Sequence, residues 1–85
     1  LLTPALKSAS GTGSGIKVEW GSVYGATGYN VYRKTANSGW VLIGKTNQTS
    51  FVDASAVKGT TYTYTVRAYY GNYMSAYNSA GLTIK

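Results

Sequence analysis

The sequence predicts an all-β chain folded as a seven-stranded antiparallel β-sandwich, and three observations support this. Apolar and polar residues alternate with period two along several segments, as in strands with one buried face. No apolar set recurs at helical spacing over ten residues. Clusters of Gly, Asn and Ser separate the alternating segments, as turns do. We expect strands at 3–9, 15–20, 28–34, 40–45, 49–53, 60–70 and 74–84.

The first two strands differ in what their side chains indicate. Pro4 lies in the first, and because proline lacks an N–H we expect that strand at a sheet edge. In segment 15–20, Val18 and Trp20 alternate with Glu19. The alternation places Trp20 in the core and the carboxylate in solvent.

The central strands continue this pattern with one irregularity. Tyr29 and Val31 point inward from segment 28–34, as does Phe51 from segment 49–53. Trp40 and Ile43 are both large but out of phase, which predicts a bulge or a twisted edge in segment 40–45.

Segment 60–70 has the longest alternation and completes the predicted core. Its inner row is aromatic and β-branched, while its outer row is rich in Thr and contains Arg67 and Tyr69. The core residues that we expect are Trp20, Tyr29, Val31, Phe51, Tyr62, Tyr64 and Val66.

The composition excludes most catalytic chemistry. Among 85 residues there is no His, no Cys and only two acidic side chains, Glu19 and Asp53. Zinc sites and His- or Cys-dependent nucleophiles therefore cannot be assembled, and the carboxylate pair of a glycosidase is not implied. We expect no enzyme activity, no metal and no cofactor. No apolar run approaches the roughly 20 residues of a membrane helix, so we expect no membrane insertion.

In order and spacing, several motifs together resemble the fibronectin type III domain, in particular the bacterial extracellular kind. Each motif alone is weak, and no Arg-Gly-Asp follows Tyr70. The matching residues are Pro4 with Leu6, segment 15–20 with its Trp20, segment 23–34, Trp40 with Ile43, segment 49–53 and segment 59–69.

The resemblance implies an immunoglobulin-like fold, with Trp20 between the sheets and Tyr62 at the tyrosine corner, where its hydroxyl bonds to the preceding connection. It also implies one domain over residues 1–85, excised from a longer multidomain chain. Such domains act as spacers between other modules of secreted or cell-wall-attached proteins. We expect a monomer whose partners are neighbouring domains of its own chain.

Two groups of residues are candidates for contacts. Tyr24, Tyr73 and Met74 fall in loops at the end of the fold where the N-terminus emerges, and would meet either a preceding domain or a ligand. Tyr32, Arg67 and Tyr69 would lie on the outer sheet face. They form either a solvated surface with ordinary cross-strand pairs or a binding site.

The formal net charge of +6 comes from dispersed cations. This dispersion argues against nucleic acid as a partner but allows weak association with anionic wall polymers, and solubility explains the charge equally well. Two functions therefore remain. The first is a non-catalytic structural spacer, and the alternative is a module that binds carbohydrate or a surface protein.

Overall fold

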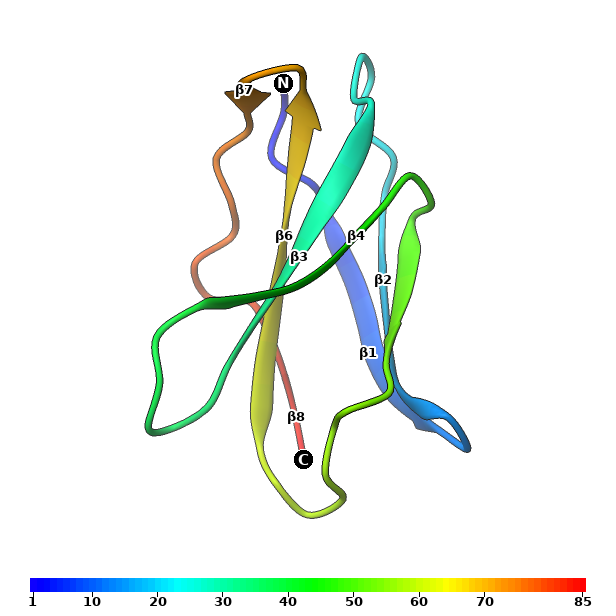
Figure 1. Cartoon of the computed structure of the whole chain (residues 1–85), viewed down its shortest axis with the longest axis vertical. Coiled ribbons are helices and arrows are strands. Elements are labelled where there is room, and N and C mark those ends of the chain that lie inside the picture. Colours follow the sequence, from blue (N-terminus) through cyan, green and yellow to red (C-terminus); the bar gives the residue numbers. More distant parts are fainter.

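Two antiparallel sheets pack face to face in the computed structural model, which describes residues 1–85 and contains no helix (Figure 1). This confirms the predicted sandwich. The smaller sheet has the order β1 (Leu6–Thr12), β2 (Gly15–Trp20), β5 (Ser50–Asp53). The larger has the order β4 (Val41–Thr46), β3 (Gly28–Lys34), β6 (Tyr62–Tyr70), and the other edge of β6 pairs with both β7 (Tyr73–Met74) and β8 (Leu82–Ile84).

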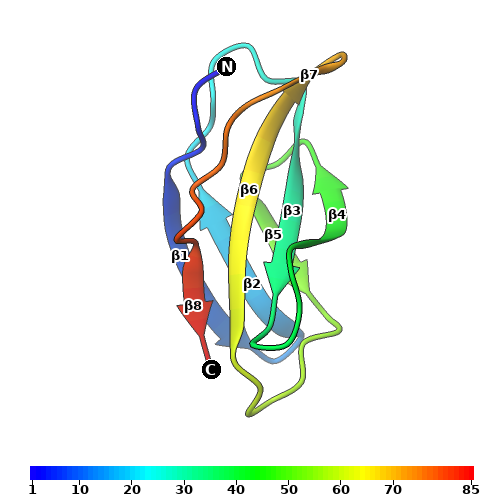
Figure 2. The same ribbon diagram turned by 90° about the vertical axis from the view of Figure 1, so that its left-hand side faces the viewer.

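The termini lie at opposite ends of the molecule, whose longest dimension is 36 Å (Figure 1). Figure 2 shows β8 beside β1, where the edges of the two sheets meet. The domain therefore has two distinct ends, which we call the N-terminal end and the C-terminal end.

The first strand begins later and ends later than predicted. It starts at Leu6, opposite Trp20, and continues to Thr12, opposite Gly15, so that only two residues form the turn. The Thr12 hydroxyl accepts the Ser14 N–H at 3.1 Å, which stabilises this tight turn. Pro4 lies before the strand and is buried, so its placement within the strand was wrong, whereas the expected position of this strand at a sheet edge is confirmed.

The single last strand predicted at 74–84 was also wrong, because the chain pairs with β6 only at β7 and β8. Between them, one backbone bond from the Ser75 N–H to the Ala68 carbonyl at 2.8 Å remains, and side chains make the other contacts with β6. The Ala68 N–H donates to Ser75 Oγ at 2.9 Å, and Thr65 Oγ1 donates to the Asn78 carbonyl at 2.8 Å. Gly81, with φ of +66°, returns the chain to the sheet edge, where a Cβ would lie only 2.7 Å from the Tyr64 carbonyl.

The irregularity predicted around Trp40 and Ile43 is confirmed. Val31 pairs with Gly44, whereas the next residue, Tyr32, pairs with Leu42, so Ile43 is the extra residue of a bulge. Trp40 lies just before β4 and outside the ladder.

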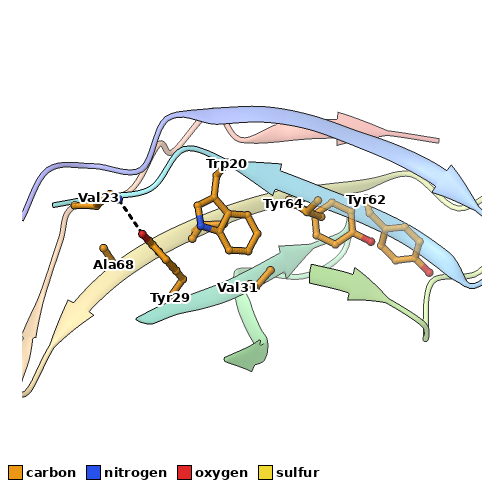
Figure 3. Close-up of a cluster of buried hydrophobic side chains, with 9 residues drawn as sticks. Trp20, Val23, Tyr29, Val31, Tyr62, Tyr64 and Ala68 are labelled. Carbon is orange, nitrogen blue, oxygen red and sulfur yellow. Dashed lines mark hydrogen bonds between the residues drawn. The ribbon is translucent and has the colours of Figure 1, made fainter. Parts of the chain in front are cut away.

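The core consists of aromatic and β-branched side chains from both sheets (Figure 3). Trp20 is 1% exposed and packs edge-on against Tyr29, with ring centroids 5.5 Å apart. Phe51 is half-buried and packs against this cluster. The other predicted core residues are all buried, namely Val31, Tyr62, Tyr64 and Val66.

Buried tyrosines need partners for their hydroxyls, and local backbone supplies two of them. Tyr29 accepts the Val23 N–H at 2.8 Å (Figure 3), and Tyr62 accepts the Val57 N–H at 2.9 Å. The second bond ties β6 to the connection before it, which is the geometry of a tyrosine corner.

Candidate functional site

One buried polar cluster joins the two sheets. Asp53 ends β5 and is 3% exposed, and its Oδ2 accepts from Arg33 Nη1 at 2.8 Å and from the Tyr64 hydroxyl at 2.6 Å. Its Oδ1 accepts from the Ser55 N–H at 3.2 Å and the Ser55 hydroxyl at 2.8 Å. Every oxygen of this carboxylate is therefore occupied by the protein itself.

The same contacts change how these groups titrate. Burial alone would raise the pKa of Asp53, but hydrogen bonds from Tyr64, Arg33 and Ser55 outweigh it and lower that pKa. Burial and the bond to Asp53 raise the pKa of the Tyr64 hydroxyl well above its ordinary value. The hydrogen bond to Asp53 raises the pKa of Arg33. The geometry stabilises an ion pair between the sheets and offers no free group for chemistry.

Sequence reasoning missed this cluster, although a signal was present. Arg33 shares the inward parity of Tyr29 and Val31 in its strand, and Asp53 shares that of Phe51. A cation on an inward row requires an anion, because an unpaired buried charge is unfavourable.

The N-terminal end carries the first predicted group of contact residues. Tyr24 is fully exposed, at 100%, and Tyr73 is 76% exposed, while Met74 is also on the surface. Tyr73 and Met74 form the short strand β7 rather than a loop, which corrects the prediction for these two residues. Leu1 lies close to Gly25, and β7 lies at the same end as the N-terminus (Figure 1). Apolar side chains are thus concentrated where the chain enters the fold.

The outer face of the larger sheet carries the second group. Lys45, Asn30 and Arg67 lie opposite one another in a row across β4, β3 and β6. Tyr32 lies opposite Thr65 rather than Arg67, and Tyr69 lies opposite Gly28. Arg67 and Tyr32 are therefore near neighbours on this face but not a direct cross-strand pair.

Three cations on this face lie over aromatic rings. Lys34 Nζ is 4.7 Å from the centre of the Trp40 ring, and Lys45 Nζ is 5.6 Å from that of Tyr69. The Arg67 guanidinium lies 5.6 Å from the ring centre of Tyr77, not over a tyrosine of its own sheet row. Trp40 and Tyr77 contact each other edge-on, with centroids 6.1 Å apart.

These side chains surround a small hollow of about 160 Å³, lined by Tyr32, Trp40, Thr65, Arg67 and Tyr77. Trp40 and Tyr77 were not predicted as site residues. The sequence pattern did not assign Tyr77 to this face, because it lies between β7 and β8, where the chain leaves the sheet edge. Trp40 was recognised only as out of phase with Ile43.

A larger, open hollow of about 700 Å³ lies at the C-terminal end, between the β1–β2 turn and the connection from β5 to β6. Its walls are mostly Gly, Ser, Thr and small apolar residues. No group of three His, Cys, Asp or Glu side chains gathers anywhere in the chain, and no helix could span a membrane.

Comparisons with known proteins give a consistent picture. No model of a known protein family matches the sequence. A crystal structure of an Fn3-like protein from Clostridium thermocellum superimposes with a TM-score of 0.66 at 27% identity, over 91% of this chain and 82% of that one. The chain is 41% identical over 69 residues, 80% of its length, to a poly(3-hydroxybutyrate) depolymerase of Delftia acidovorans. It is 33% identical over 57 residues, 67% of its length, to a poly(3-hydroxybutyrate) depolymerase of Ralstonia pickettii.

The matched region is a small part of these relatives. The chain spans 13% of the Delftia enzyme and 11% of the Ralstonia enzyme. The likeness therefore concerns one module of each enzyme.

Proposed function

The chain is a fibronectin type III-like domain, and from that premise we propose that it is a non-catalytic spacer within a larger secreted bacterial protein. The relatives support a place beside a polymer-degrading catalytic module, because the similarity is confined to a short part of each depolymerase. The one buried carboxylate has all its oxygens engaged in a structural network, which supports a role without catalysis.

The observation that carries the proposal is the apolar surface at the N-terminal end. Exposed apolar side chains that gather in one region mark a contact site, and Tyr24 and Tyr73 are both exposed at this end. Leu1 lies close to Gly25, next to Tyr24, and β7, which contains Tyr73, lies at the same end as the N-terminus (Figure 1). The module that precedes this domain in its parent protein is therefore the occupant that fits. With the termini at opposite ends of a 36 Å body, the domain would set both the distance and the angle between its neighbours.

Small-angle scattering on this domain joined to its natural preceding module tests the proposal. We expect a narrow size distribution that broadens when Tyr24 and Tyr73 are both replaced by Ser, because the docked angle is lost. The matched control replaces Val52 and Val57 by Ser, which are exposed apolar residues outside this surface. Equal broadening in both variants would mean that the tyrosines do not hold the angle.

A second measurement separates the spacer from a binding module. The isolated domain is titrated with neutral glycans and with poly(3-hydroxybutyrate) particles. The spacer proposal expects no binding that depends on Tyr24, Tyr73 or Met74. Micromolar binding abolished by replacing these residues would assign the N-terminal end to a ligand instead.

A further inference from the structure

The outer face of the larger sheet has an unbalanced positive charge. Lys34, Lys45 and Arg67 lie on it, and no acidic side chain does. The two acids of the chain are both elsewhere. Asp53 is engaged with Arg33 between the sheets, and Glu19 belongs to β2 of the other sheet, where Ser8 donates to it. An anionic partner would therefore meet no repulsion from a neighbouring carboxylate on this face.

The spacing of the three cations favours a chain-like anion over a compact one. Lys45 and Arg67 are separated by two strand spacings, roughly 10 Å, and Lys34 lies four residues along β3 from Asn30, roughly 13 Å away. A single phosphate or carboxylate cannot reach all three. A polymer with repeated charges can.

The hollow bordered by Trp40 and Tyr77 adds a second feature. Its volume of about 160 Å³ is below the roughly 300 Å³ of a site that encloses a whole small molecule, so it fits one ring of a longer ligand. Arg67 borders it, and a hydrogen bond of 2.8 Å from Nε to the Ser75 carbonyl holds its guanidinium in place. The terminal nitrogens of Arg67 make no hydrogen bond to the protein, and their planar arrangement matches a carboxylate.

The Tyr32 hydroxyl is the polar group of the lining that suits a hydroxyl-bearing unit. Thr65 also lines the hollow, but it is 1% exposed and its hydroxyl donates to the Asn78 carbonyl. Asn30 is buried beside the hollow, and its side-chain nitrogen donates weakly to the Tyr32 hydroxyl at 3.4 Å.

We propose that this face binds a carboxylate-bearing polysaccharide, independently of the spacer role. One sugar ring would pack in the hollow that Trp40 and Tyr77 border, with its carboxylate on Arg67, while Lys34 and Lys45 attract the units on either side. Single-stranded nucleic acid fits less well, because Trp40 and Tyr77 meet edge-on at 79° around one ring-sized hollow and do not form a row of faces for successive bases.

Nuclear magnetic resonance with oligogalacturonate tests this on the intact chain. The two tryptophans provide an internal control, because Trp40 borders the hollow whereas Trp20 is buried between the sheets. We expect the indole N–H signal of Trp40 to shift on titration and that of Trp20 to stay in place. Binding should weaken as salt rises, since exposed charges are screened.

A charge-matched pair of variants locates the site. Lys34→Gln with Lys45→Gln and Lys7→Gln with Lys17→Gln each remove two of the six net positive charges, but the second pair lies on the smaller sheet. The first pair should weaken binding about tenfold, and the second should leave it unchanged. Equal weakening by both pairs would overturn the proposal in favour of non-specific attraction. The thermal midpoint of each variant verifies that it is folded.

The carboxylate itself is tested by chemistry on both partners. Methyl-esterified oligogalacturonate should bind at least tenfold more weakly than the free acid, and Arg67→Lys, which keeps the charge but loses the planar fork, should reduce that preference. The proposal fails if ester and acid bind equally, if a single-stranded oligonucleotide binds more tightly than the oligosaccharide, or if the Trp40 signal does not move. If Arg67→Lys does not fold, the comparison of ester with free acid and the two pairs of Lys→Gln variants still test the proposal.

Discussion

Two arginines on neighbouring strands of one sheet show how the face of a strand changes what a side chain does. Arg33 of β3 points between the sheets, where it pairs with Asp53 at 2.8 Å and lies 4.9 Å from the Tyr62 ring centre. Arg67 of β6 points outward, over Tyr77, with no carboxylate near it. The inner arginine is held by partners from the opposite sheet, while the outer one keeps its terminal nitrogens free for a partner from outside.

The largest expected effect comes from the middle of the inner face. Trp20→Ala should lower the free energy of unfolding by about 3 to 5 kcal/mol, because it empties the largest core site. Urea denaturation measures this. A loss under about 1 kcal/mol would mean that the inner face tolerates a cavity and that its aromatic packing is not what holds the sheets together.

Next in size is the partner of the inner arginine. Asp53→Asn should cost about 2 to 3 kcal/mol, because the amide nitrogen that replaces one oxygen cannot accept the bonds that Arg33, Tyr64 or Ser55 donate. Glu19→Gln is the matched control, since it changes the only other acid, whose one hydrogen bond is long at 3.4 Å. Similar losses in the two variants would remove the distinction between a buried and a surface carboxylate.

The pH dependence of stability sharpens the same contrast. The pKa of Asp53 is lower in the folded protein than in the unfolded chain, where it is about 4. The stabilisation that Asp53 gives to the folded state is therefore complete above about pH 4 and is lost as the pH falls through its pKa in the folded protein. The folded pKa of Tyr64 is raised, so its contribution is complete below about pH 10 and is lost as pH rises further. Unfolding midpoints measured from pH 2 to 11 should fall at both extremes.

Variants assign each limb of that profile. Asp53→Asn should flatten the acid limb, and Tyr64→Phe should flatten the alkaline one. An acid limb that persists unchanged in Asp53→Asn would show that another group causes it.

The smallest expected effect is on the outer face. Arg67→Gln should lower stability by about 1 kcal/mol, because the half-buried Arg67 loses one cation–ring contact and one hydrogen bond. Thermal unfolding beside Asp53→Asn gives the comparison directly. A loss as large as that of Asp53→Asn would mean that Arg67 is structural, like Arg33.

Much of this architecture was predictable from alternation. The period-two pattern of segments 15–20 and 28–34 matched β2 and β3 residue for residue and assigned Trp20 to the inner face. The alternation of segment 60–70 did the same for Tyr64. The out-of-phase Trp40 and Ile43 predicted the bulge. These succeed because successive Cβ atoms of a strand point to opposite faces whatever the strand pairs with.

Long-range partners were not predictable in the same way. The last strand is split because side chains join β6 to the segment between β7 and β8. Ser75 accepts from Ala68 of β6, and Thr65 of β6 donates to Asn78. Nothing in the local sequence pattern indicates these contacts. The hollow at Trp40 and Tyr77 depends on them too, since Tyr77 reaches the outer face only because the chain leaves the sheet edge.

By itself, then, the sequence determined the sandwich, the inward rows and the scarcity of groups for catalysis, because alternation and composition act through each residue and its immediate neighbours. Only the tertiary structure decided that Arg33 meets Asp53 while Arg67 meets Tyr77. It also decided that Lys34 and Lys45 share the face of Arg67 with no acid near them. Those pairings join residues 10 to 20 positions apart, and they exist only once strand register and sheet stacking bring the side chains together.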